Sequence, residues 1–148
     1  MVRIIMHGCN GKMGQVITRM AAEDKECEIV AGIDTCEGRL NGYPVFDSLQ
    51  DCDVEADVVI DFSNAKAVDG LLENCKKRRL PVVLCTTGLS KEQIQKVEEY
   101  SKRDGSAQIC EYVSWNQSAD AAAAGMRQRC CHLQDTILKL WKSIIIRK

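Results

Sequence analysis

The 148-residue chain is poor in proline, histidine and aromatic residues, with 2 prolines, 2 histidines and 5% Phe, Trp and Tyr. It has no apolar run long enough to span a bilayer, and its formal net charge of -1 comes from charges of both signs spread along the chain. These absences argue against a membrane-spanning protein. The balanced charge also argues against a protein that binds nucleic acid or an anionic membrane surface. The start, Met1-Val2-Arg3, leads directly into a strand-like segment without a small-residue cleavage site, so we expect a cytoplasmic protein with no signal peptide.

Cysteine is the exception to this scarcity, with nine residues. A secreted disulfide scaffold does not fit, because the count is odd, no secretory signal precedes the cysteines, and strands alternate with helices around them. The sequence has no C-x-x-C pair, which argues against a zinc ribbon or a thioredoxin-type site. The adjacent Cys130, Cys131 and His132 cannot easily enclose one ion, so we expect no metal site. Reduced, partly buried thiols are the favoured interpretation.

Hydrophobic periodicity predicts an α/β fold for the first two thirds of the chain. Short apolar runs predict buried strands at residues 2–7, 28–33, 56–60 and 80–85. Apolar residues at helical spacing predict helices at residues 15–23, 64–79 and 90–102, the last with a Ser90–Gln93 capping box. The middle helix is expected to pack through a face made of Ala67, Leu71, Leu72 and Cys75. Residues 35–56 are expected to be irregular, and the alternation predicts a parallel sheet with right-handed crossovers.

A glycine-rich turn, Gly8-Cys9-Asn10-Gly11-Lys12-Met13-Gly14, separates the first predicted strand from the first predicted helix. In this setting Gly8 permits a tight turn, Gly11 lets backbone amides approach a pyrophosphate, and Gly14 lets the helix pack closely. The N–H groups at the start of the helix also favour phosphate. The spacing G-x-x-G-x-x-G departs from the commoner G-x-G-x-x-G, and a glycine turn without a ligand is the alternative.

Asp34 ends the second predicted strand, at the place where a carboxylate can accept the ribose hydroxyls of an adenosine. A turn residue at the end of a strand is the alternative interpretation. A carboxylate there would repel a 2′-phosphate, and Thr35 stands where an arginine would have helped NADPH. We therefore expect NADH to be accepted at least as well as NADPH.

Two polar segments follow later strands, Asp61-Phe62-Ser63 and Cys85-Thr86-Thr87-Gly88. Open parallel sheets bind ligands at the carboxyl ends of their strands, so these loops are placed to flank the nicotinamide half of a cofactor. Together with the glycine turn, they predict a Rossmann-type doubly wound parallel sheet over residues 1–103.

Four motifs in this order and spacing, GCNGKMG, AGID, VVIDFS and VVLCTTGLS, resemble the 4-hydroxy-tetrahydrodipicolinate reductase (dihydrodipicolinate reductase) family of bacterial lysine and diaminopimelate synthesis. The resemblance covers residues 1 to about 103. It implies hydride transfer from NADH or NADPH to a cyclic unsaturated imine dicarboxylate, and a homotetramer assembled through a C-terminal α+β domain. It also implies cofactor contacts from Gly8, Cys9, Asn10, Gly11, Lys12, Met13, Asp34, Cys85, Thr86 and Thr87, with Phe62 nearby.

Residues 104–148 do not share this resemblance. The family's substrate domain carries a signature resembling E-x-H-H-x-x-K and a later G-T pair, and neither occurs here, so no catalytic residue is expected in this chain. The resemblance also implies a strand after the helix that ends near Arg103. We expect that strand to be lost, which would leave an uncovered sheet edge and marginal stability or aggregation.

The non-matching segment reads as an out-of-frame translation. Codons for residues 111–121, EYVSWNQSADA, can be chosen so that a one-base shift gives NMSLGINLLM, which resembles a cofactor-contacting segment of the family. Codons for residues 140–148, LWKSIIIRK, can be chosen so that a two-base shift gives VEKHHNQK, which contains the missing signature. We therefore infer one slip near Asp104 and a second near Gly125, with an irregular or partly helical tail. A genuine but divergent tail is the alternative.

The sequence thus predicts the cofactor half of an NAD(P)H-dependent reductase, which binds nucleotide without turnover. A non-catalytic NAD(P)-binding regulatory module is an alternative, because dinucleotide-binding domains serve both uses. Another two-domain dehydrogenase with a similar glycine turn is a third possibility, and the DFS and CTTG segments argue against it.

Overall fold

The computed structural model describes residues 1–36, 41–104 and 107–109. The chain divides into two compact units, Met1–Val113 and Ser114–Lys148. The second unit lies outside the described residues. Cys130, Cys131 and His132, where no metal site is expected, and the stretches 111–121 and 140–148 also lie outside them.

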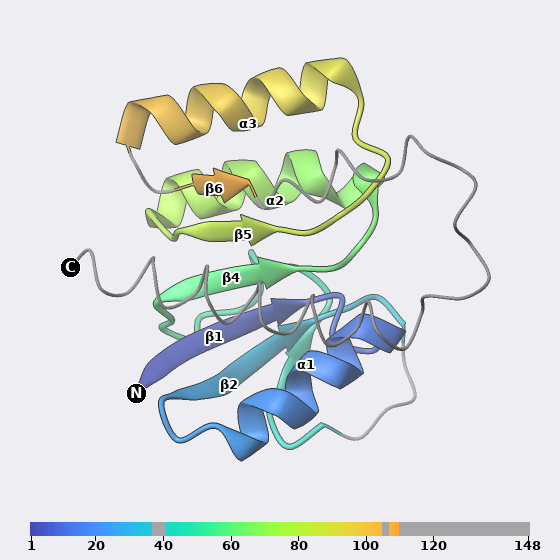
Figure 1. The fold of residues 1–148 in the computed structure, drawn as a ribbon, viewed down its shortest axis with the longest axis vertical. Helices are drawn as coiled ribbons and strands as arrows, with labels where there is room; N and C mark the ends of the chain where they lie inside the picture. Colours follow the sequence, from blue (N-terminus) through green and yellow to red (C-terminus); the bar gives the residue numbers. More distant parts are fainter. Residues whose placement is uncertain (37–40, 105–106, 110–148) are drawn as a thin grey trace, which may run out of the picture. The chain divides into compact units, whose positions relative to one another are not determined.

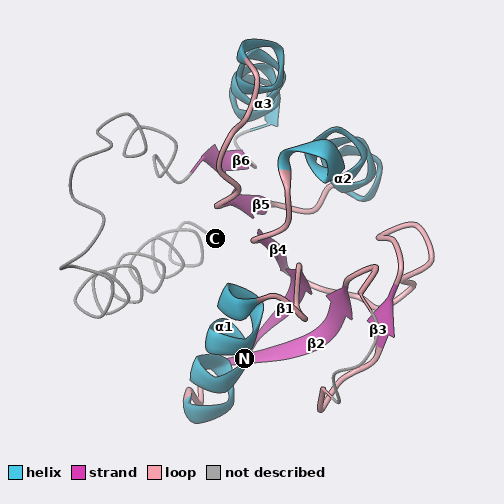
Figure 2. Cartoon of the chain, turned by 90° about the vertical axis from the view of Figure 1, so that its right-hand side faces the viewer, coloured by secondary structure: helices cyan, strands magenta, loops and turns pink. Residues whose placement is uncertain are grey.

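Parallel strands form a single sheet in the order β3-β2-β1-β4-β5-β6 (Figure 1, Figure 2). Their bounds are β1 Val2–His7, β2 Cys27–Ile33, β3 Val45–Phe46, β4 Val58–Asp61, β5 Val82–Leu84 and β6 Ala107–Ile109. The chain moves outward in one direction from β1 to β3 and then returns beside β1 with β4. Loops on either side of this reversal diverge and leave a crevice at the carboxyl ends of the strands. This order confirms the predicted fold class.

Within the described residues, three helices cover the two faces of this sheet, α1 Lys12–Glu23, α2 Ala65–Arg78 and α3 Lys91–Asp104. Figure 2 shows α1 on one face and α2 and α3 on the other. Ile5 of β1 belongs to the core cluster that includes Val68 and Leu71 of α2 and Val97 of α3. His7 lies two residues beyond Ile5 on the same strand and therefore faces the same side. None of the helices in the described part is long and apolar enough to cross a membrane.

Local capping explains where α2 and α3 begin. Asn64 accepts a hydrogen bond from the Lys66 amide at the start of α2. At the start of α3, the Ser90 amide donates to Oε1 of Gln93 (3.0 Å) and the Gln93 amide donates to Oγ of Ser90 (3.2 Å). The predicted capping box is confirmed, because these reciprocal bonds satisfy N–H groups that a helix start leaves without partners.

The buried face of α2 differs from the predicted one at a single position. Leu71, Leu72 and Cys75 are buried as expected, but the fourth member is Val68, and Ala67 is only half-buried. The neighbouring alanine and valine are both compatible with helical spacing. The rotation of the helix against the sheet, which decides between them, depends on tertiary packing.

Two strands differ from the sequence-based expectation. β3 lies within residues 35–56, which were expected to be irregular, and it pairs with the end of β2 through Gly32 and Ile33. The predicted loss of the strand after Arg103 is wrong, because β6 pairs in parallel with all three residues of β5. Segments of two and three residues are too short to show a period. Their extended form is decided by the neighbouring strand, which supplies their hydrogen-bond partners.

Most of the described cysteines are buried in this fold. Cys9, Cys27, Cys52 and Cys75 are buried free thiols, and Cys36 is an exposed one. Burial, followed by the charge of Asp61, raises the pKa of Cys75 to about 12. The arrangement agrees with the predicted reduced, partly buried thiols.

Candidate functional site

The glycine turn after β1 has the tight path that its sequence predicts. Gly8 has a φ of +81°, and a Cβ added there would lie 2.8 Å from the carbonyl oxygen of Phe62. A Cβ on Gly14 would lie 2.2 Å from the carbonyl oxygen of Gly8. Neither contact is possible for a side chain, so this turn can take its path against β4 and α1 only with glycine at both positions.

The start of α1 is open toward solvent. Gly11 is the exposed N-cap residue, and no side chain caps the helix there. The first N–H groups of a helix have no partner within it, and they carry the positive end of the helix dipole. Lys12 is exposed and Met13 is half-buried in this first turn. These residues fit an anionic group such as a pyrophosphate, because they offer uncapped amides and leave room beside a glycine.

Asp34 braces the glycine turn from the end of β2. Its Oδ2 accepts a hydrogen bond from the Asn10 amide (2.8 Å), and its Oδ1 accepts one from the Cys36 amide (2.9 Å). A carboxylate can accept about four hydrogen bonds, so these two amides leave acceptor capacity for ligand hydroxyls. The predicted strand-end role and the predicted ribose-binding role are therefore compatible with each other.

Side-chain amides extend this bracing to α1. Asn41 donates to Oδ1 of Asn10 (2.8 Å), and Gln15 donates to Oδ1 of Asn41 (2.9 Å) and to the carbonyl oxygen of Cys9 (3.0 Å). The Cys9 side chain lies beneath the turn against Gly32. Burial, followed by the charge of Asp34, raises the pKa of Cys9 to about 11, so its thiol stays neutral and packs as a small apolar group.

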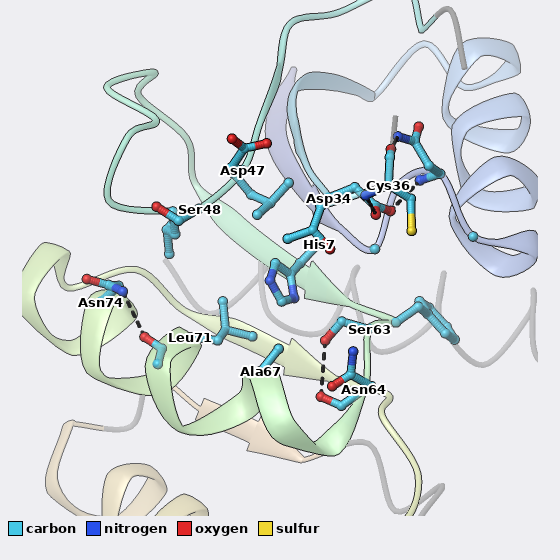
Figure 3. Close-up of a pocket in the computed structure, with 18 residues that line it drawn as sticks. His7, Asp34, Cys36, Asp47, Ser48, Ser63, Asn64, Ala67, Leu71 and Asn74 are labelled. Carbon is cyan, nitrogen blue, oxygen red and sulfur yellow. Dashed lines mark hydrogen bonds between the residues drawn. The ribbon is translucent and has the colours of Figure 1, made fainter. Parts of the chain in front are cut away.

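A cavity of about 420 Å³ opens at the carboxyl ends of β1, β2 and β4. Figure 3 shows His7 in the middle of the labelled residues, with Asp34 and Cys36 on one side and Ala67 and Leu71 of α2 on the other. The volume lies within the range of small-molecule sites. Of the predicted cofactor contacts, the cavity lining contains Gly8, Asn10, Gly11 and Asp34, and Phe62 lines it too.

The other predicted contacts lie beside this cavity without lining it. Cys9 is buried under the turn, while Lys12 and Met13 begin α1. Cys85 and Thr86 are buried at the end of β5, and Thr87 is exposed. The Cys85 amide donates to the carbonyl oxygen of Asp61 (2.9 Å), which places this loop next to the end of β4.

Several lining residues carry no sequence signal that predicts them. They are Asp47, Ser48, Leu49, Asn64, Ala67, Gly70, Leu71 and Asn74, and His7 lines the cavity with them. Most come from α2 and from the segment after β3, which tertiary packing brings to the carboxyl edge. His7 had a usable signal, because it is the last residue of β1 and directly precedes the glycine turn.

A sequence model of the family described as dihydrodipicolinate reductase, N-terminus, matches residues 2–112. The chain belongs to this family. The match includes β6 and ends beyond the boundary near residue 103 that the sequence motifs predict.

Two curated relatives are called 4-hydroxy-tetrahydrodipicolinate reductase. The protein from Clostridium novyi and the one from Caldanaerobacter subterraneus subsp. tengcongensis are each 50% identical to this chain over 102 residues. Each alignment covers 69% of this chain and 40% of the relative. The chain therefore matches only two fifths of the length of these dihydrodipicolinate reductases.

Solved structures share the fold. A dipicolinate-bound dihydrodipicolinate reductase from Paenisporosarcina sp. TG-14 aligns with a TM-score of 0.58 and 24% identity, over 68% of this chain and 44% of that one. A scyllo-inositol dehydrogenase from Lactobacillus casei with bound NAD(H) and scyllo-inositol aligns with a TM-score of 0.62 and 16% identity, over 74% of this chain and 36% of that one. At these identities, the likeness shows only that this chain shares its fold with both solved structures.

Proposed function

We propose that this chain supplies the dinucleotide-binding part of an NAD(P)H-dependent reductase that converts 4-hydroxy-tetrahydrodipicolinate (dihydrodipicolinate) to tetrahydrodipicolinate in lysine and diaminopimelate synthesis. The observation that carries the proposal is the uncapped start of α1 behind a turn that requires glycine at positions 8 and 14, with Asp34 at the edge of the same cavity. Membership of the dihydrodipicolinate reductase family supports the reaction class.

Each predicted contact has a role in this proposal. Gly8, Cys9, Asn10, Gly11, Lys12 and Met13 form the turn and first helical residues that would receive the pyrophosphate. Asp34 would accept the adenosine ribose hydroxyls with the acceptor sites that Asn10 and Cys36 leave open. The loop with Cys85, Thr86 and Thr87 would flank the nicotinamide, which supplies the hydride when the cofactor is bound. In this proposal, these residues bind and orient the cofactor. The substrate site would belong to the C-terminal domain that the family resemblance implies, beyond the residues that match here.

Cofactor preference follows from the charges around the cavity. Asp34 and Asp47 line it, and no lysine or arginine is among its described lining residues. A 2′-phosphate would therefore meet carboxylates, and we expect NADH to bind at least as tightly as NADPH. Arg39 lies in the stretch 37–40, outside the described residues, and a direct comparison of the two dissociation constants tests this preference.

The sharpest test of the site is Gly11→Asp. Aspartate is a favourable N-cap residue, although its Cβ would lie 3.3 Å from the carbonyl oxygen of Gly8, so urea unfolding of the variant is measured as well. The added carboxylate stands where a phosphate must bind. We expect NADH binding by the wild-type chain, measured by titration calorimetry, and at least a tenfold weaker affinity in the variant. Gly42→Asp adds the same charge in open space outside the cavity lining and serves as the matched control. Equal NADH affinities for wild type and Gly11→Asp would contradict the proposed site.

The domain boundary is part of the same proposal. The sequence motifs predict a dinucleotide-binding domain at residues 1–103, and the family match extends to residue 112. We propose that out-of-frame sequence follows this domain, with NADH binding and no turnover in this chain alone. Sequencing the gene across the codons for residues 100–148 tests the frame. Restored segments resembling SANMSLGIN and EKHHNQK would support it, and a reading that confirms the given codons would leave a divergent tail.

A further inference from the structure

A buried carboxylate lies where β1, β4 and β5 end together. Asp61, the last residue of β4, is fully buried, and its Oδ1 lies 2.6 Å from Nδ1 of His7 at the end of β1. Ser63 donates to the same oxygen from its amide (3.1 Å) and its hydroxyl (2.6 Å). Thr86, after β5, donates its hydroxyl hydrogen to Oδ2. The carboxylate therefore joins the end of β1 to the segments that follow β4 and β5.

Asp61 is ionised at neutral pH. Burial alone would raise its pKa, but the hydrogen bonds from His7, Ser63 and Thr86 and the charge of His7 outweigh burial and lower it. An ionised carboxylate only accepts hydrogen bonds, so Nδ1 of His7 carries the hydrogen in this contact. The ring is fixed in one orientation, and its other nitrogen, Nε2, has no hydrogen-bond partner among the described residues.

His7 lines the cavity beside the glycine turn. Its side chain is 12% exposed, and Figure 3 shows it between the residues that end β2 and those of α2. Among the described lining residues, it is the one side chain that can carry a positive charge. A dinucleotide brings two phosphate charges into this setting. The amides at the start of α1 and Lys12 in its first turn also favour these charges, and His7 is the group that can add a positive charge from the cavity lining itself.

We propose that His7 is a further dinucleotide-binding residue, with Nε2 donating to a phosphate oxygen while Asp61 holds Nδ1 on the other side of the ring. The inference rests on the proposed dinucleotide binding and deepens it. Asp61 is a positioning residue, because it acts through His7 and contacts no ligand itself. It also links the His7 contact to Thr86, in the loop expected to flank the nicotinamide.

Other charged and titratable groups surround His7. Asp61 faces it from β4, while Asp34 after β2, the Cys36 thiol and Asp47 after β3 share the cavity lining. The α2 residues of the lining are uncharged, and Thr86 is neutral. Carboxylates ordinarily titrate below about pH 5 and thiols above about pH 8, whereas imidazoles titrate between these values. The titrations are therefore made at about pH 5.5 and about pH 7.5, a window in which carboxylates and thiols ordinarily keep their charge states.

The first test compares the wild-type chain with His7→Gln in calorimetric NADH titrations at both ends of that pH window. Glutamine can still donate a hydrogen bond to Asp61 but carries no charge. We expect the variant to bind NADH about tenfold more weakly than the wild type at the lower pH, where an imidazole most readily carries a positive charge. Unfolding of both proteins without ligand is measured at each pH, to show that the variant is folded.

The outcomes separate this inference from the proposed function. A wild-type chain that bound no NADH at either pH would overturn the proposed function and the role of His7 together. Wild-type binding that His7→Gln reproduced at both pH values would overturn the role of His7 alone.

A second measurement needs no variant of His7. The chain has only 2 histidines, His7 and His132, so ¹⁵N-histidine labelling gives a spectrum that His132→Gln assigns. Saturation with NADH should shift Nε2 of His7 and leave its Nδ1 protonated. Unchanged His7 resonances at saturation would overturn the proposed contact.

Discussion

At the scale of single residues, the structure at the carboxyl edge of the sheet depends on positions that accept only one residue type. Gly14 contacts the turn so closely that any Cβ would collide with backbone, and sequence spacing indicates that requirement. Asp61 is different. The sequence places it at the end of a strand, but only the packed sheet brings His7, Ser63 and Thr86 to its two oxygens.

Asp61→Asn should destabilise the chain in a pH-dependent way. The lowered pKa of Asp61 means that its carboxylate stabilises the fold above the ordinary aspartate pKa of about 4, and that this contribution is lost as the pH falls through the lower folded-state pKa. An amide cannot accept every donor that now faces the carboxylate. We therefore expect the free energy of unfolding to fall by about 1–3 kcal/mol at pH 7 in urea titrations.

The difference between wild type and Asp61→Asn should shrink as the pH is lowered below about 4. Asp53→Asn changes the same group at an exposed position and is the control. A difference that stayed constant from neutral to acidic pH would show that the carboxylate charge has no part in the stabilisation.

At the scale of elements, a residue that caps α3 also joins this helix to α2. Gln93 completes the capping box of α3, and its Nε2 also donates to the carbonyl oxygen of Ala65 (2.6 Å) and to Oδ2 of Asp69 (2.9 Å). The sequence predicts the cap but does not indicate the bonds to α2. One side chain therefore fixes both the start of a helix and its packing against the next.

Gln93→Ala should consequently cost more stability than Ser90→Ala. Loss of the Ser90 hydroxyl removes a cap, which costs about 1 kcal/mol. Loss of the Gln93 amide removes the reciprocal cap and both bonds to α2, so we expect about 2 kcal/mol in urea unfolding. Gln95→Ala, at an exposed position of the same helix, should change little. Equal losses for Ser90→Ala and Gln93→Ala would mean that the bonds between α2 and α3 contribute nothing.

At the scale of the whole molecule, the described sheet extends past the boundary that the motifs predict. β6 covers the edge of β5 through a parallel pairing of Val82–Leu84 with Ala107–Ile109. The predicted marginal stability rests on an uncovered β5, and that premise does not hold for the described residues. Whether the chain aggregates stays a prediction.

Two polypeptides test the contribution of β6. Residues 1–113, the first compact unit, should unfold cooperatively and bind NADH. Residues 1–104 end with α3, expose the unpaired groups of β5, and should unfold at lower urea concentration and aggregate on concentration. Sedimentation velocity and urea unfolding measure both properties. Matching stability and matching monomer content in the two polypeptides would show that β6 is dispensable.

The sequence by itself determined the parallel α/β fold, the strands β1, β2, β4 and β5, the three helices and the glycine turn with Asp34. These features have local causes: hydrophobic period, capping residues, and glycine where no Cβ fits. The tertiary structure alone decided the strands β3 and β6, the choice of Val68 over Ala67 in the core, and the group formed by His7, Asp61 and Thr86. Those features join residues far apart in the chain, and their hydrogen bonds and packing exist only once the strands lie side by side.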